Sequence, residues 1–282
     1  RYPSLSENAL SVASLDDGGF FFVSNQPLSG RDVEVARVDA QGNPVWMKSF
    51  GAGFAANEHI AWGCNALVQE DEGVAYVMGP TTSGGIGGED ILLMKLDLQT
   101  GTPQWSRAFG SLGDDLGRDL IPVPGGLALL GSSDGFGGTV TDHPNELSQN
   151  MDEQDILLTK LNAAGFVDWA QTYGGEERDK AVGVRFDSEL GYTISAYTSS
   201  SVFGNTGGSM DPLFIRADFE GGVACQNIPV NLVSLPVAVS SEDLTSSESF
   251  TTSGFTAPVT VSAFEPDDVY QCQECFNQPQ FE

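Results

Sequence analysis

The stretch that decides the fold is DILLTKLNAAGFVDWAQTYGG, residues 155–175, in which an apolar segment, a polar turn and a second segment end on a glycine pair. A closely similar stretch, DILLMKLDLQTGTPQWSRAFG, begins 65 residues earlier at Asp90. A strand–turn–strand unit that recurs at such an interval is typical of a repeated sheet or blade. The sequence therefore predicts an architecture more firmly than it predicts a function.

The unit occurs four times, and an aspartate opens each copy. The four anchor aspartates are Asp32, Asp90, Asp155 and Asp211. A basic residue stands five positions after each anchor, and a turn glycine follows ten or eleven positions after it. Three copies then carry a tryptophan in the same register, and the fourth has Cys225 there; the three are Trp46, Trp105 and Trp169. Ligand residues seldom recur in every repeat, so we expect these tryptophans to pack between neighbouring blades.

Two further strand-like segments precede each anchor, so each repeat contains four strands. Strands such as ILLMKL and ILLTKL are apolar at consecutive positions, which indicates that both faces of each sheet are covered. The sequence predicts an all-β fold, a β-propeller of four-stranded antiparallel blades. The predicted repeats span residues 1–58, 59–117, 118–180 and 181–231.

The tail, residues 232–282, fits the same template less well. VTVSAFEPDDVYQC, residues 259–272, aligns without a gap with residues 156–169, and NLVSLPVAVSS stands where the first strand of a blade would be. This pattern predicts a degenerate fifth blade. A separate small β segment is the alternative.

The charge excludes several partners. Twelve Lys and Arg against 39 Asp and Glu give a net charge of −27, which repels nucleic acid and anionic lipid. No apolar stretch approaches the roughly 20 residues that a membrane span needs, so direct membrane insertion is not expected. The chain opens on Arg1 without a signal-like segment, and we expect a processed chain or a fragment.

Loop lengths indicate which face binds a partner. From the turn glycine of the second strand to the anchor aspartate, the four repeats have distances of 13, 17, 29 and 20 residues. Function tends to lie in variable loops on a rigid scaffold, and these loops share a face with the links between repeats. The candidate residues on this face are Asp114, Asp115, Asp134, Asp142, Asp152, Glu176 and Asp179. Such carboxylates could hold Ca²⁺, but no spacing matches an EF-hand loop, so no cofactor is assigned and solvated loop charge is the alternative.

Enzyme signatures are few. His59 and His143 are the only histidines, HExxH and GxSxG are absent, and no catalytic residue is assigned.

The cysteines are expected to be structural, with a disulfide from Cys225 to Cys272 or Cys275 that ties the tail to the repeats. We expect Cys64 to stay a buried free thiol.

A family resemblance rests on four segments: DDGG at 16–19, KLNAAGFVDWAQTYGG at 160–175, YGGEERDKAVGV at 173–184 and FGNTGGSMDPLFIRAD at 203–218. They resemble the Gly- and Asp-rich repeats of secreted bacterial β-propellers, which occur in surface proteins of the Bacteroidota and are related in pattern to SBBP-type repeats. The resemblance covers residues 1 to about 228. It implies export, an extracellular or cell-surface location and a role as one module of a longer chain or assembly.

Two functions follow as expectations. The first is a non-enzymatic module that binds protein or glycan, as in adhesion, or that spaces other modules in a surface assembly. The second is a glycoside hydrolase on a five-bladed propeller, because two suitably separated carboxylates are enough for that chemistry.

Overall fold

The structure is a computed structural model. It describes residues 9–25, 33–51, 65–82, 85, 87–135, 154–175, 177–203, 209–223, 228–229 and 232–243. This part of the chain is β-structure apart from two single 3₁₀ turns, η1 (Glu70–Glu72) and η2 (Ser201–Phe203). Within it, no helix has the length and apolar character needed to cross a membrane.

The strands form four antiparallel sheets, which we call sheets A to D in chain order. Sheet A contains β1 (Ala9–Ser14), β2 (Phe20–Asn25), β3 (Val33–Val38) and β4 (Pro44–Gly51). Sheet B contains β5 (Asn65–Gln69), β6 (Val74–Thr81), β7 (Asp90–Asp97) and β8 (Pro103–Gly110). Sheet C contains β9 (Asp115–Val123), β10 (Gly126–Ser133), β11 (Asp155–Asn162) and β12 (Val167–Tyr173). Sheet D contains β13 (Asp179–Asp187), β14 (Gly191–Thr198) and β15 (Asp211–Ala217).

The prediction of an all-β fold built from repeated antiparallel sheets is confirmed. Each sheet takes its consecutive strands from one predicted repeat, although β9 and β13 begin slightly before the expected boundaries at 118 and 181. Tight turns with a positive-φ glycine join the strands, as at Gly42, where φ is 81°. Glycine adopts this left-handed backbone without a steric penalty, which explains why it recurs after each anchor aspartate.

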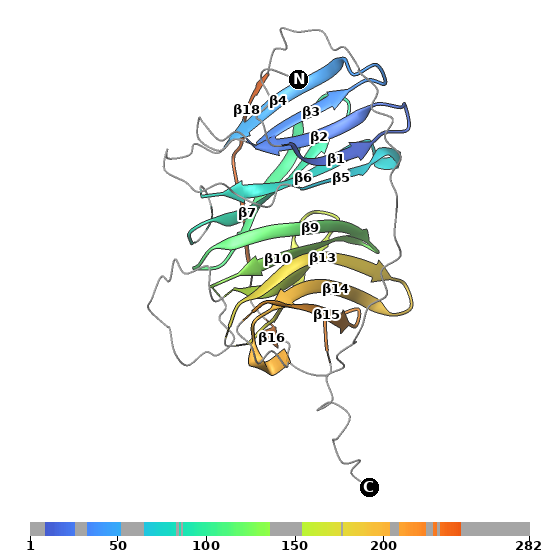
Figure 1. The fold of residues 1–282 in the computed structure, drawn as a ribbon. Helices are drawn as coiled ribbons and strands as arrows, with labels where there is room; N and C mark the ends of the chain where they lie inside the picture. Colours follow the sequence, from blue (N-terminus) through green and yellow to red (C-terminus); the bar gives the residue numbers. More distant parts are fainter. Residues whose placement is uncertain are drawn as a thin grey trace.

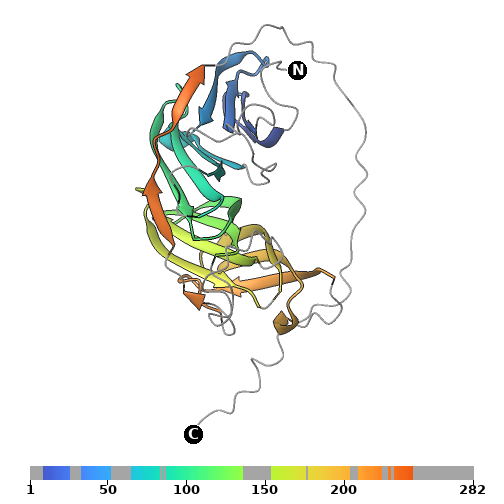
Figure 2. The ribbon, with the colours of Figure 1, turned by 90° about the vertical axis from the view of Figure 1, so that its left-hand side faces the viewer.

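The four sheets stack in chain order along an open arc (Figures 1 and 2), with sheets A and D at its opposite ends. The first strands β1, β5, β9 and β13 lie side by side from sheet to sheet, and we call this row the inner edge. The fourth strands β4, β8 and β12 lie nearer the convex side of the arc (Figure 2). The inner edge therefore lies on the concave side.

The described part of the tail, residues 232–243, adds its strands to existing sheets, while the fifth blade as a whole stays a prediction. β16 (Ile228–Pro229), at the end of the predicted fourth repeat, pairs with β12. The tail strands β17 (Val233–Pro236) and β18 (Ser240–Asp243) then pair with β8 and β4. The chain thus runs back along the convex side of sheets C, B and A (Figure 2). The physical reason is that the outermost strand of a sheet offers unpaired backbone groups, which an extended segment satisfies. The rest of the predicted fifth repeat, from residue 244, lies outside the described residues.

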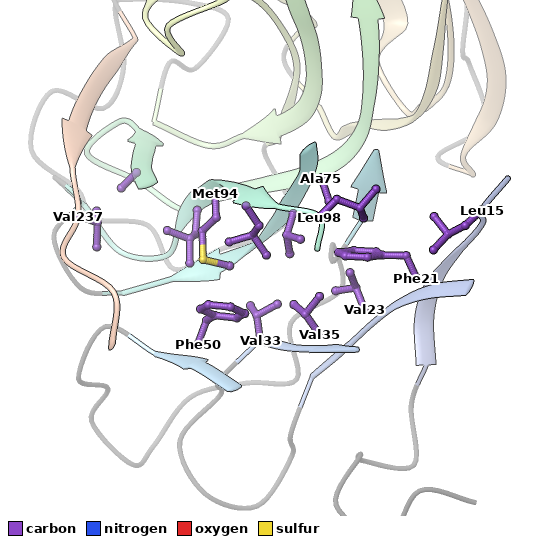
Figure 3. Close-up of a cluster of buried hydrophobic side chains, with 14 residues drawn as sticks. Leu15, Phe21, Val23, Val33, Val35, Phe50, Ala75, Met94, Leu98 and Val237 are labelled. Atoms are coloured by element: carbon purple, nitrogen blue, oxygen red, sulfur yellow. The ribbon is translucent and has the colours of Figure 1, made fainter. Parts of the chain in front are cut away.

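Three apolar clusters fill the spaces between successive sheets. In β7, Leu92 and Met94 face sheet A, and Ile91 and Leu93 face sheet C. The cluster between sheets A and B includes Val237 of the tail at its outer end (Figure 3). Because both faces of sheet B are buried here, β7 is apolar at the four consecutive positions 91–94.

Candidate functional site

A buried aspartate stands at the start of the first strand of sheets C and D. At the B–C junction, Asp115 donates its backbone N–H to the Glu89 carbonyl oxygen at 2.5 Å. Its Oδ2 accepts from the Ser111 backbone N–H at 2.6 Å and from the Ser111 hydroxyl at 2.8 Å. These bonds tie the link between two sheets to the loop that precedes β7.

The C–D junction repeats this arrangement around Asp179. Its backbone N–H donates to the Gln154 carbonyl oxygen at 2.6 Å. Its Oδ2 accepts from the Gly175 N–H at 3.0 Å and from the Ser200 hydroxyl at 2.7 Å. Asp115 and Asp179 are both completely buried, so they hold the sheets together and are not directly open to a ligand.

The anchor aspartates of sheets B and C lie beside these groups. Asp90 and Asp155 are 1% and 2% exposed. A Cβ added to Gly110 would lie 1.5 Å from Asp90 Oδ1, and one added to Gly174 would lie 1.7 Å from Asp155 Oδ1. The anchor carboxylate therefore needs a glycine at the neighbouring strand end, which explains the FG and YGG endings of the repeats.

Three of the predicted ligand-face residues come together at the B–C junction. Asp134 Oδ1 accepts from the backbone N–H of Asp114, and the Asp134 N–H donates to the Asp114 carbonyl oxygen at 3.2 Å. Asp114 Oδ1 in turn accepts from the Glu89 N–H at 2.8 Å. Asp115 follows directly in the chain, whereas Asp179 lies at the next junction. The remaining candidates, Asp142, Asp152 and Glu176, lie outside the described residues.

Burial raises the pKa of several of these carboxyl groups. The pKa of Asp115 rises to about 6 because the group is desolvated, with a smaller contribution from the Asp114 charge. Burial, and then the charges of Asp114 and Asp115, raise the pKa of Asp134 to about 7. Burial and the Asp179 charge raise that of Asp155 to about 7. These groups take up protons in mildly acidic solution.

No metal site is evident in the described part of the chain, where no three His, Cys, Asp or Glu side chains are grouped so as to hold an ion. Calcium in the acidic loops stays a prediction. The cysteine predictions also stay open, because Cys64, Cys225, Cys272 and Cys275 lie outside the described residues.

The tryptophans lie between sheets. Trp46 of sheet A donates its Nε1–H to the Leu98 carbonyl oxygen of sheet B at 3.1 Å. A Cβ on Gly101, the positive-φ turn glycine of sheet B, would lie 2.8 Å from the Trp46 ring. Trp105 lies against Gly165 of sheet C, and Trp169 lies against Gly221 beyond β15, in the same way. Each ring therefore covers the turn of the next repeat.

A polar row crosses the inner edge at one register position. Ser11 Oγ donates to Asn65 Oδ1 at 3.2 Å, and Asn65 Nδ2 donates to Asp119 Oδ1 at 3.3 Å. Asp119 Oδ2 accepts from the Val184 backbone N–H at 2.9 Å. The row links the first strands of all four sheets through side-chain hydrogen bonds.

A cationic cluster lies next to this row, and the sequence analysis missed it. Arg118 occupies the β-bulge of β9, Arg178 immediately precedes β13, and Lys180 is the second residue of β13. Burial and then the Arg178 charge lower the pKa of Arg118, while burial, Arg118 and Arg178 lower that of Lys180. The available signal was the scarcity of basic residues, which makes a local group of three unusual in this chain.

No protein-family model matches the chain, and a search of curated proteins finds no significant match.

Proposed function

We propose that the chain is a non-enzymatic binding module of an exported, cell-surface or extracellular protein, with its four sheets as successive blades of a β-propeller. The stacking order supports the propeller, because every sheet presents its first strand to one shared edge, and sheets A to C place their fourth strand toward the opposite side. The Gly- and Asp-rich repeats resemble those of secreted bacterial propellers, which supports the location.

One observation carries the binding function: the scaffold residues repeat from junction to junction, but the side chains beside them on the inner edge do not. The buried aspartate recurs as Asp115 and Asp179. The positions that flank it hold Asp114 and Leu116 at one junction and Arg178 and Lys180 at the next. Leu116 is buried, whereas Arg178 and Lys180 are half-buried. A rigid array whose side chains vary on one face is typical of repeat proteins that bind ligands on a concave surface.

The polar character of the inner edge favours a glycan as the ligand. Ser11, Asn65 and Asp119 provide hydroxyl, amide and carboxylate groups that are half-buried and held by one another. Sugar hydroxyl groups can accept from and donate to such side chains. A flat protein interface would need an apolar centre larger than the two exposed valines of these strands, Val12 and Val182.

A glycan microarray with neutral and acidic oligosaccharides tests the proposal. We expect retention of at least one class of glycan, with no release of reducing sugar on prolonged incubation. Time-dependent cleavage that is lost in an Asp114→Asn or Asp134→Asn variant would instead establish the glycosidase. Absence of retention on the whole array would reject the glycan form of the proposal.

A further inference from the structure

The cationic cluster differs from most other basic residues of the described chain in that its members lack acidic partners. Five basic side chains in the described part of the chain have an acidic partner: Arg37 with Asp17, Lys48 with Asp243, Lys95 with Glu72, Lys160 with Asp168 and Arg185 with Asp119. In a chain with 39 acidic residues, such pairing is the expected outcome. Arg118, Arg178 and Lys180 have no ion pair with any described acid. The same is true of Arg107, which lies over the Phe166 ring, and of the exposed Arg216, but these two do not lie at the same junction.

The two arginines also lack hydrogen-bond acceptors. The Nε atoms of Arg118 and Arg178 are buried and have no acceptor within the described structure. A buried donor without an acceptor is costly, and the cost is larger for a charged group. Both residues are half-buried and lie at the surface of the inner edge rather than in one of the apolar clusters.

The backbone fixes where these cations stand. The Arg118 carbonyl oxygen accepts from Asn65 Nδ2 at 3.5 Å, within the polar row. The Arg178 carbonyl oxygen accepts from the Ser199 N–H at 2.8 Å and from the Ser199 hydroxyl at 3.2 Å. β9 and β13 are neighbours on the inner edge, so Arg118 stands on one strand while Arg178 and Lys180 stand at the start of the adjacent one. A β-bulge such as that at Arg118 commonly redirects a side chain toward a functional site.

We propose that Arg118, Arg178 and Lys180 form an oxyanion-binding site on the inner edge, which takes a sulfate, phosphate or carboxylate group carried by the ligand. Guanidinium groups match the geometry of such anions with paired N–H donors, and the Lys180 ammonium adds a point charge. The bound anion would supply the missing acceptors and offset the repulsion among the three cations. This inference rests on the proposed binding function, to which it adds the chemical class of the ligand.

The direct test is isothermal titration of the purified chain at low ionic strength with inorganic sulfate, a sulfated monosaccharide and a uronic acid. We expect wild type to bind at least one probe, and Arg118→Gln/Arg178→Gln to weaken that binding by roughly tenfold or more. Arg216→Gln removes an exposed charge of β15 and is the matched control, with unchanged affinity. Binding of sulfate alone would identify a free anion as the ligand, and tighter binding of a sugar probe would identify an acidic glycan.

Absence of binding by wild type, or equal affinity of wild type and the double variant, would overturn the site. If the double variant does not fold, Lys180→Gln gives the same test with a half-buried side chain. A stability measurement adds a second readout, because removal of a mutually repelling cation should leave the melting temperature of Arg178→Gln unchanged or raised without anion. A lowered melting temperature would assign Arg178 a structural role instead. Glycan-array retention of neutral sugars alone would leave the binding function standing and reject the oxyanion site.

Discussion

The B–C and C–D junctions have the same backbone plan but different flanking residues. Both place a fully buried aspartate whose N–H bonds the residue before an anchor aspartate. At the B–C junction both flanking residues make contacts within the junction. Asp114 accepts from the Glu89 N–H, and Leu116 is only 7% exposed. At the C–D junction the equivalent residues, Arg178 and Lys180, have no ion pair with a described acid. The B–C flanks therefore take part in the contacts of the junction, whereas the C–D flanks have no ionic partner among the described residues.

The largest expected effect concerns the tryptophans, which both junctions share. Trp105→Ala and Trp169→Ala should each lower the free energy of unfolding by roughly 3 kcal/mol, because each ring fills space against the turn of the next repeat. Urea unfolding measures this change, and Leu112→Ala, at a side chain 68% exposed, is the control with a small effect. If only one tryptophan matters, the two junctions are not equivalent in packing.

The second largest effect tests whether the residues that flank the buried aspartate differ in burial between the two junctions. Leu116→Lys places at the B–C junction the residue that sheet D has at the equivalent position, and it should cost roughly 2 to 3 kcal/mol because it buries an unpaired ammonium group. Urea unfolding of this variant beside Leu116→Met gives the comparison. An unchanged stability would show that the B–C flank is as accessible as the C–D flank.

The raised pKa of Asp155, the anchor aspartate of sheet C, predicts that the stability of the protein depends on pH. The folded-state pKa of Asp155, about 7, lies above its ordinary value of 3.8, so the folded protein binds this proton more tightly than the unfolded chain does. The contribution of Asp155 is therefore most favourable at about pH 4 and is lost as the pH rises toward 7. Asp155→Asn removes this titration and should raise stability at pH 8 by roughly 2 kcal/mol relative to wild type.

Unfolding midpoints at pH 5, 6, 7 and 8 measure that dependence. The slope between pH 5 and 7 should be smaller in Asp155→Asn than in wild type, while Asp211→Asn, at an exposed anchor, should leave it unchanged. Identical slopes in all three proteins would show that the buried anchor does not titrate in this range.

The repeats were predictable because each copy shows the same spacing of aspartate and glycine, and three copies add a tryptophan in the same register, which a repeated sheet explains. The path of the tail was not predictable, because segments as short as VSLP and SSED have no periodicity that distinguishes a strand of a new sheet from an added edge strand. For the site, loop lengths indicated the face that joins Asp114, Asp115 and Asp134. They did not indicate Arg118, whose position depends on a β-bulge, or the convergence of residues 60 positions apart across two sheets.

The smallest expected effect is the reciprocal change at the C–D junction. Lys180→Leu gives sheet D the residue that sheet C has at Leu116, and we expect stability to change by no more than about 0.5 kcal/mol. Lys180 is half-buried and has no ion pair with a described acid, and burial together with the charges of Arg118 and Arg178 disfavours its charged form. Replacement of the ammonium group removes that repulsion, which offsets the lost contacts of the lysine stem. Urea unfolding in chloride solution and in sulfate solution tests the structural role and the anion-binding role of Lys180. In chloride the variant should be as stable as wild type. When sulfate replaces chloride, the stability of the variant should increase less than that of wild type. A loss of more than 1 kcal/mol in chloride would mean that Lys180 builds the junction, and the contrast between the two flanks would then disappear.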